Sequence, residues 1–347
     1  MSIPAPRTSP LDGLGVTVPV LAAPMAGGPT TPALVAAAAR SGGMGFLAGG
    51  YKTAQQLAGQ IGEVRAATQV FGVNVFAPNP FAVDPGEYRR YADALRPLAE
   101  RLGVELPPAP AEDDDHWEAK LDVLRSDPVP VVSFTFGIPP HAVVASLCSQ
   151  GSVVVQTVTT AAEARAAADA GADMLAVQGY AAGAHSATLA PSRFPDPVPT
   201  AVLAAQVKDA TGCPVIAAGG LATPAQVADA IRSGADAVMV GTALLRTSES
   251  GASPVHQAAI AGARGETVLT RSFSGRPARG IRNRFIDTFD AIAPSGYPAI
   301  HYLTSPIRKA AAAAGEPDAL NLWAGTGYQQ AGTGQAADVL RALASAL

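Results

Sequence analysis

The sequence predicts a (β/α)8 barrel, the TIM-barrel fold, with a smaller lid domain after the eighth strand. Three stretches, TTPALVAAAARSGGMGFLAGG, TTAAEARAAADAGADMLAVQG and ATPAQVADAIRSGADAVMVGT, repeat one order of elements: a threonine, a helix, a glycine and an apolar strand. Strands that alternate with helices in this way form a parallel sheet with the helices outside it. Eight strand candidates occur along the chain, and eight parallel strands close this kind of barrel.

The three repeated helices carry recognisable start and stop signals. In residues 30–50 and 222–242 a proline follows the threonine N-cap candidate, at the first helical position, where its missing N–H costs nothing. In residues 159–179, Thr160 and Glu163 match a capping box. Each helix ends at a glycine that suits a C-cap, and an apolar strand follows at once.

The strand candidates are short apolar runs bounded by glycine, proline or polar turn residues. An open doubly wound sheet is the competing fold, but the turn AAPMAGGPT after the first strand lacks the G-x-G-x-x-G pattern of that fold. The barrel is therefore favoured. In chain order the candidates are residues 18–24, 44–50, 70–76, 129–136, 152–158, 174–179, 214–220 and 237–242.

Long segments outside the simple repeats predict the domain organisation. Residues 1–243 are expected to form the barrel, with a helical insertion at about 77–128 that contains the acidic, exposed stretch LPPAPAEDDDHWEAK. Residues 244–320, with five arginines in TRSFSGRPARGIRNRF, are expected to form the lid over the barrel mouth. Residues 321–347 are expected to return to the barrel.

Composition narrows the class of protein. The 347 residues are 48% hydrophobic and only 15% charged, which is typical of a globular protein. The net charge of -4 gives no positive field for nucleic acid or an anionic membrane. Cys148 and Cys213 stand apart in apolar settings, which favours reduced thiols over a disulfide or a metal site. No apolar run reaches the roughly 18 residues of a membrane helix and the start MSIPAPRTSPLDG lacks a signal-peptide core, so we expect a soluble cytoplasmic protein without a metal.

The loops after the seventh and eighth strands predict a phosphate site. The sequences AAGG and VGTALL place glycines, free backbone N–H groups and a helix start at the carboxyl ends of these strands. Barrels commonly bind phosphate at this position, because backbone N–H groups and the helix dipole both favour an anion. Gly219, Gly220, Gly241 and Thr242 are the candidate phosphate-binding residues.

Three other strand ends point to a flat ligand. Glycines after the first strand, in PMAGG, let the backbone near Met25 approach a ring closely. Asn74 lies inside an apolar strand and Gln178 ends another, and an unsatisfied buried amide costs roughly 1–3 kcal/mol. Each amide therefore either holds a neighbouring loop or meets the mixed donor and acceptor edge of a flavin. Together with the phosphate loops, these positions favour flavin mononucleotide (FMN).

The sequence also resembles a known family. The motifs APMAGG, VNVF, SFTFG, VQGYAAGAH, PVIAAGG, GADAVMVGTALLRTSES, SFSGRPARGIRNRF, YPAIHYLT and LWAGTGY follow one another along almost the whole chain. In this order they are similar to those of the nitronate monooxygenases, which are FMN-dependent barrels. The resemblance implies a substrate-side histidine at His185. It also implies flavin contacts at Met25, Asn74, Gln178, Gly183, Gly220, Gly241 and Thr242.

Near the histidine the chain departs from the common pattern of that family. Ala181 stands where a glutamate is usual, Ala184 where a glycine is usual, and Ser186 with Ala187 where Arg-Gly is common. Thr135 occupies a position at which many relatives carry a second histidine.

The resemblance implies oxidation of alkyl nitronates, for example propionate 3-nitronate, by O2 to a carbonyl product and nitrite, through one-electron flavin chemistry. His185, cationic or hydrogen-bonding near neutral pH, is expected to orient the anion or to remove the α-proton of a neutral nitroalkane. Tyr297, Tyr302 and Lys309, or an arginine of the run at 271–284, are candidate substrate-binding residues of the lid. Three alternatives remain open at this point: an FMN-dependent NAD(P)H enoyl reductase, a phosphate-binding barrel isomerase or lyase without flavin, and a non-catalytic flavin-binding protein.

Overall fold

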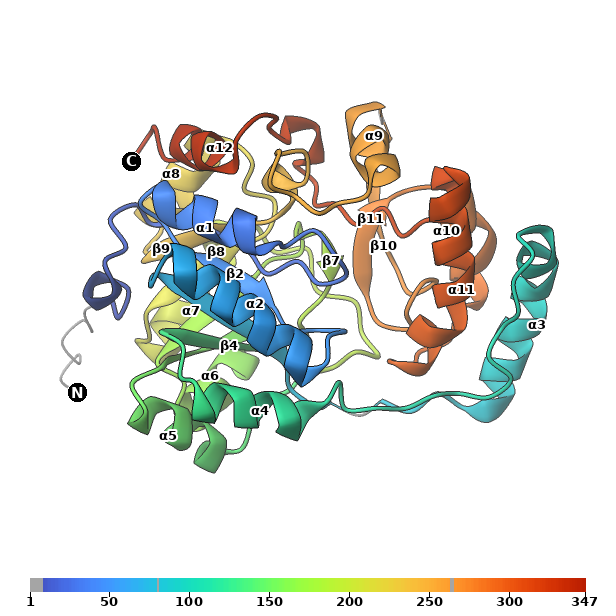
Figure 1. The fold of residues 1–347 in the computed structure, drawn as a ribbon, viewed down its shortest axis with the longest axis horizontal. Helices are drawn as coiled ribbons and strands as arrows, with labels where there is room; N and C mark the ends of the chain where they lie inside the picture. The colour runs from blue at the N-terminus through green and yellow to red at the C-terminus, as the bar shows by residue number, and fades with distance from the viewer. Residues whose placement is uncertain (1–8, 80, 263–264) are drawn as a thin grey trace.

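A computed structural model of the chain describes residues 9–79, 81–262 and 265–347. Eight parallel strands close a barrel in the order β1-β2-β3-β4-β5-β6-β8-β9, which confirms the predicted fold and excludes the open sheet (Figure 1). Each of these strands lies within one predicted range. They are β1 Val20–Ala22, β2 Gly45–Ala48, β3 Phe71–Phe76, β4 Val131–Thr135, β5 Val153–Val158, β6 Met174–Gln178, β8 Val215–Ala218 and β9 Ala237–Val240.

Large apolar side chains fill the inside of the barrel. Leu21, Phe46, Val155 and Ile216 point inward from four different strands and are fully buried. Gly72 on β3 leaves room for the ring of Phe46, because a Cβ at this position would collide with that ring. The interior is therefore a packed core, and ligands bind at its ends.

Helices cover the outside of the barrel and begin largely as the sequence predicts. Thr31 and Thr223 cap their helices, and Thr223 forms a complete capping box with Gln226. Thr160 also caps its helix, but the carboxylate of Glu163 bonds elsewhere, as described below. The barrel helices are α1 Pro32–Arg40, α2 Ala54–Ala67, α4 Trp117–Ser126, α5 His141–Ser149, α6 Ala161–Asp169, α7 Thr200–Thr211, α8 Pro224–Arg232 and α12 Ala336–Leu343.

A second hydrophobic core forms the lid, whose ribbon lies to the right of the barrel in Figure 1. Its antiparallel strands β10 (Thr267–Thr270) and β11 (Ala278–Ile281) are joined by the two-residue strand β7 (Ala184–His185), which comes from the loop after β6. This shared sheet fastens the lid to the barrel. The lid helices are α3 Pro85–Arg101, α9 Pro254–Gly262, α10 Arg284–Phe289 and α11 Ala299–Ala314.

The segment 77–128, expected as one insertion in the barrel, divides between the two cores. On α3, Tyr88, Tyr91 and Leu95 pack into the lid core, and α3 contacts α11. On α4, Trp117 and Leu121 pack against the barrel. The reason is that the apolar face of α3 packs against the lid helices. No local pattern in the sequence indicates which of the two cores this face will join. The last helix, α12, packs against α1 and α8 at the barrel.

Candidate active site

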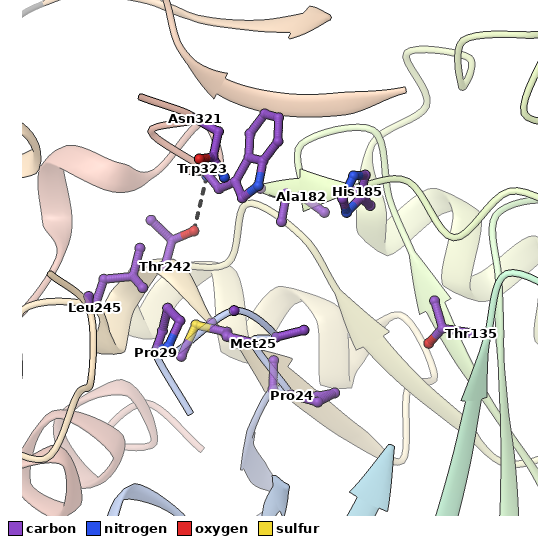
Figure 2. Close-up of a pocket in the computed structure, with 18 of the residues that line it drawn as sticks. Pro24, Met25, Pro29, Thr135, Ala182, His185, Thr242, Leu245, Asn321 and Trp323 are labelled. Atoms are coloured by element: carbon purple, nitrogen blue, oxygen red, sulfur yellow. Dashed lines mark hydrogen bonds between the residues drawn. The ribbon is translucent and has the colours of Figure 1, made fainter. Parts of the chain in front are cut away.

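One cavity of about 810 Å³ opens at the carboxyl ends of the barrel strands, beneath the lid. Tyr302 and Lys309 of the lid line it, and Tyr297 stands behind the His185 ring, with ring centres 5.6 Å apart. The structure thus places every sequence-predicted site residue except Tyr297 in the lining of one cavity. Figure 2 shows Met25, His185 and Thr242 among them. From the barrel the lining includes Met25, Asn74, Gln178, Gly183, His185, Gly219, Gly220, Gly241 and Thr242.

Backbone N–H groups converge on this cavity from the loops after β8 and β9. Gly219 and Gly220 adopt φ of +110° and +72°, and a Cβ on Gly220 would lie 2.6 Å from the Cβ of Ala181. Among the described residues, no partner is recorded for the N–H groups of Gly220 and Leu221, or for that of Thr242 at the start of a short 3-10 helix. Unpaired N–H donors from two loops make a cradle that suits a phosphate group.

The hydroxyl of Thr242 connects this cradle to the chain that follows the lid. Its Oγ1 accepts a hydrogen bond of 3.0 Å from the backbone N–H of Gly325, drawn as a dashed line in Figure 2. Gly183 meets the same segment, because a Cβ there would lie 2.5 Å from the carbonyl carbon of Ala324. The segment 324–325 therefore closes tightly over the glycine loops.

Asn74 is held so that one end of its amide faces the cavity. Its Nδ2 donates to Ser133 Oγ at 2.9 Å and to Thr135 Oγ1 at 3.0 Å, and the side chain is buried. Thr135 in turn lies 3.3 Å from Thr157, hydroxyl to hydroxyl. The donor end is thus satisfied, while Oδ1 has no recorded partner in the described chain and remains open as an acceptor.

Gln178 uses both ends of its amide on the turn that follows β6. Its Nε2 donates to the carbonyl of His185 at 3.0 Å, and its Oε1 accepts from the N–H of Ala187 at 2.7 Å. Further along, the Glu163 carboxylate accepts from the N–H of Leu189 at 2.8 Å. These contacts match the interpretation in which the amide holds a neighbouring loop, although one N–H of Gln178 is left over for a ligand.

His185 is a neutral imidazole in this environment. Its Nε2 lies 2.8 Å from Ser274 Oγ. Burial, followed by the positive charges of Arg276 and Arg308, lowers the pKa of His185 to about 3. The sequence left open whether His185 is cationic or hydrogen-bonding. The structure supports a neutral, hydrogen-bonding imidazole at neutral pH.

The positive charges near His185 come from two arginines that the sequence did not single out, Arg276 and Arg308. Arg276 is fully buried, lies 4.0 Å from the Phe136 ring centre, and donates to the carbonyls of Ser186 and Thr188, with Nη1 left unpaired. Arg308 lines the cavity and donates to the carbonyl of His301 at 2.7 Å. Within the described part of the chain, neither forms a salt bridge with a carboxylate. Asp113 and Asp115 also line the cavity, so it is the part beside these two arginines that favours an anion.

Helical spacing explains why the sequence pointed to Lys309 as a substrate-binding residue and not to Arg308. The sequence pointed to Lys309 on the same helix, but the next position along a helix faces about 100° away. Lys309 is exposed at the rim, and Arg308 turns inward. Arg276 lies in the arginine-rich stretch that the sequence assigned to the lid, and nothing in its spacing separates a buried arginine from a solvated one.

Tyr51 and Tyr302 line the cavity, and Tyr297 lies just outside its lining. The hydroxyl of Tyr297 donates to that of Tyr51 at 3.2 Å, and the Tyr51 ring stacks on His301 with ring centres 4.5 Å apart. Tyr302 donates to the Asp113 carboxylate, which occupies its hydroxyl hydrogen. Burial raises the pKa of Tyr51 to about 12, so its phenol stays protonated and can donate a hydrogen bond.

Backbone strain is concentrated around the same cavity. In the described ranges, the non-glycine residues with positive φ are Tyr51, Asp115, His116, Phe136 and Ala184, and each of them lines the cavity. Such conformations cost of order 1–3 kcal/mol each and persist where the surrounding structure enforces them, often at functional sites. The strain supports this cavity as the candidate active site.

In the residues that the structure describes, no three His, Cys, Asp or Glu side chains lie close enough to hold a metal ion. Over the same residues, no helix combines the length and the apolar character needed to cross a membrane.

A closed parallel barrel whose carboxyl face carries free backbone N–H groups, a neutral imidazole and arginines that pair with no described carboxylate belongs to the (β/α)8 class of enzymes. Comparison with known proteins gives the family. The chain matches the nitronate monooxygenase family model over residues 8–345. It therefore belongs to the nitronate monooxygenase family, whose members are flavin-dependent oxidoreductases.

Individual relatives agree with this assignment. A probable nitronate monooxygenase of Staphylococcus aureus (strain Newman) is 37% identical over 318 residues, which cover 90% of this chain and 89% of that protein. The structure of a nitroalkane oxidase from Streptomyces ansochromogenes matches with a TM-score of 0.92 and 43% identity, over 97% of both chains. FabK from Thermotoga maritima matches with a TM-score of 0.74 and 26% identity, over 97% of this chain and 94% of that one.

Proposed function

We propose that this protein uses FMN and O2 to oxidise alkyl nitronates, such as propionate 3-nitronate, to a carbonyl product and nitrite. The observation that carries the proposal is the positive charge on one side of the cavity. Arg276 and Arg308 stand in or beside it without a carboxylate partner among the described residues, and they flank a neutral His185. A nitronate is an anion with two oxygen acceptors, which matches this set of donors.

The cavity residues fit FMN. The unpaired N–H groups of Gly220, Leu221 and Thr242 would hold its phosphate. The open Oδ1 of Asn74 and the remaining N–H of Gln178 would meet the acceptor and donor positions of the ring edge, and Met25 would lie against the ring. When bound, the flavin supplies one-electron transfer between an electron-rich carbon and O2.

The chain's own residues would then bind and orient the substrate. Arg308 and the protonated phenol of Tyr51 would hold the nitronate oxygens, while the buried charge of Arg276 stabilises the anion from behind. Phe136 and Trp323 would exclude water from the same space, which strengthens these electrostatic contacts. For a neutral nitroalkane, His185 would take the α-proton, because the nitronate anion that forms beside it offsets the burial and positive charges that otherwise lower its pKa. A nitronate needs no such step.

An oxygen-electrode assay tests the proposal. The purified flavin-containing protein is mixed with propionate 3-nitronate, and we expect oxygen uptake together with nitrite release. No uptake with propionate 3-nitronate or with simple alkyl nitronates would refute the proposal. Anaerobic mixing with NADPH tests the enoyl reductase alternative, because that enzyme would rapidly bleach the flavin. A purified protein that contains no flavin would instead favour the isomerase or lyase.

We also propose a cytoplasmic location. Cys148 and Cys213 are free thiols in the structure, one of them buried, as expected in a reducing compartment.

A further inference from the structure

We infer that Ser274 is a positioning residue that fixes the tautomer of His185, with the hydrogen on Nε2 and the lone pair on Nδ1, which faces the cavity. The inference rests on the proposed function only for its catalytic consequence. The tautomer itself follows from three polar groups: the imidazole of His185, the hydroxyl of Ser274 and the backbone carbonyl of Arg276.

The hydroxyl of Ser274 lies between the other two groups. Its Oγ is 2.8 Å from His185 Nε2 and donates to the carbonyl oxygen of Arg276 at 3.3 Å. Ser274 is 1% exposed and Arg276 is fully buried, so water does not replace either contact. A serine hydroxyl has one hydrogen and two lone pairs, and a carbonyl can only accept.

Only one arrangement satisfies all three groups. If the serine hydrogen points to the Arg276 carbonyl, the serine oxygen must accept from Nε2–H of His185. The reverse arrangement would turn the serine hydrogen toward Nε2 and leave a buried carbonyl without the donor that the structure gives it, at a cost of roughly 1–3 kcal/mol. The first arrangement is therefore favoured, and it leaves Nδ1 unprotonated.

The position of Nδ1 agrees with this assignment. His185 lines the cavity, and no hydrogen bond to its Nδ1 is recorded from the part of the chain that the structure describes. Nδ1 is also not among the buried polar atoms that lack a partner, so it is accessible from the cavity. The rings of Phe136, Tyr297 and Trp323 surround the imidazole, with ring centres 5.8, 5.6 and 5.6 Å away.

The docking of the lid creates this arrangement. Ser274 belongs to the lid segment that leads into β11, and β11 pairs with β7 so that Ala278 stands opposite His185. The backbone of His185 is thus held by the lid sheet, and its ring is held by a lid hydroxyl. Neither contact exists without the lid.

The consequence concerns neutral substrates. When a nitroalkane loses its α-proton, the C–H bond breaks, a new N–H bond forms at Nδ1, and the electron pair stays on the nitronate. The resulting imidazolium keeps its Nε2–H on Ser274, while Arg308 faces the new anion. A nitronate substrate has already lost this proton, so its oxidation does not depend on the tautomer.

Nitrogen NMR on the flavin-loaded enzyme tests the tautomer directly. The spectrum of protein labelled with ¹⁵N at histidine is compared with that of His185→Asn, which identifies the His185 signals. We expect Nε2 to carry the hydrogen and Nδ1 to have the shift of an unprotonated nitrogen. A spectrum with the hydrogen on Nδ1 overturns the inference whatever the activity.

Kinetics of Ser274→Ala and Ser274→Thr test the role of the hydroxyl. We expect Ser274→Ala to lower kcat for a neutral nitroalkane by roughly tenfold or more, to change nitronate oxidation by no more than about twofold, and to shift the His185 tautomer. Ser274→Thr keeps the hydroxyl and should retain both activities. Equal losses on both substrates would mean that Ser274 is merely structural. Failure of the proposed function would look different, with no nitronate oxidation by the wild-type enzyme despite the expected NMR spectrum.

Discussion

Gln178 Nε2 donates a hydrogen bond of 3.0 Å to the backbone carbonyl of His185, and this bond joins the end of a barrel strand to the histidine turn. The other end of the same amide accepts from Ala187. The barrel therefore sets where the histidine stands, whereas Ser274 of the lid sets the direction of its ring. The geometry of the candidate active site therefore depends on both the barrel and the lid.

His185→Asn should lower turnover of a neutral nitroalkane by about 10²- to 10⁴-fold, because the variant lacks the base for the α-proton. Nitronate oxidation should fall far less. The flavin content should stay unchanged, because the cradle residues are untouched. Initial rates with both substrates and the flavin-to-protein absorbance ratio measure these effects. Wild-type rates on both substrates would remove His185 from the mechanism.

Arg308→Met should raise KM for a nitronate by roughly 10- to 100-fold, with a smaller change in kcat. A charge-assisted hydrogen bond to a bound anion contributes about 1.5–3 kcal/mol, and its loss weakens binding of the ground state. Arg308→Lys keeps the charge, so its KM should lie between those of Arg308→Met and the wild type.

The matched control for this series is Arg284→Met on α10. Arg284 is an exposed arginine of the same lid, so its loss should leave KM unchanged. Steady-state kinetics at low and high salt measure the difference, since screening weakens the binding of an anion by charge. An equal KM for Arg308→Met and the wild type would show that Arg308 does not bind the substrate.

Gly183→Ala should destabilise the protein and lower its flavin content. The added Cβ would lie 2.5 Å from the carbonyl carbon of Ala324, so the segment over the cradle must move. Gly59→Ala in α2 is the control, because nothing lies within 4 Å of its Cβ and the change should stabilise the helix by about 0.5–1 kcal/mol. Urea unfolding and flavin absorbance measure both variants. A Gly183→Ala variant as stable as wild type would contradict the tight closure described here.

Acid should destabilise the fold through its buried histidines. Burial lowers the pKa of His185 to about 3, and lowers the pKa values of His256 and His301 as well. The unfolded chain binds protons at a histidine pKa of about 6.5, so it holds more protons than the folded state below that pH. Stability contributed by neutral His185 is therefore complete above pH 6.5 and is lost as the pH falls toward 3.

Comparison of wild type with His185→Asn isolates this effect from that of the carboxylates. Urea midpoints at about pH 7 and about pH 5 should differ less for the variant, because one proton-linked group is gone. Equal pH dependence of the two proteins would mean that His185 is not held neutral by the fold.

Local patterns in the sequence were enough to predict the barrel and the gathering of its loop residues. The carboxyl ends of parallel strands meet at one face, so correct strand assignment already placed Asn74, Gln178, Gly220 and Gly241 near one another. The patterns could not tell which partners each side chain would choose. Gln178 bonds the histidine turn, and Tyr302 bonds Asp113 across 189 residues of sequence.

The sequence by itself determined the eight strands, the capped helices and the glycine loops, because these depend on hydrophobic periodicity and on backbone freedom at neighbouring positions. The tertiary structure decided what surrounds His185. Burial of Arg276, the inward turn of Arg308 and the hydroxyl of Ser274 come from the docked lid, far along the chain, and together they make the histidine neutral and give it a direction. Charge, burial and hydrogen bonding act through space, so these properties exist only once the two cores have packed together.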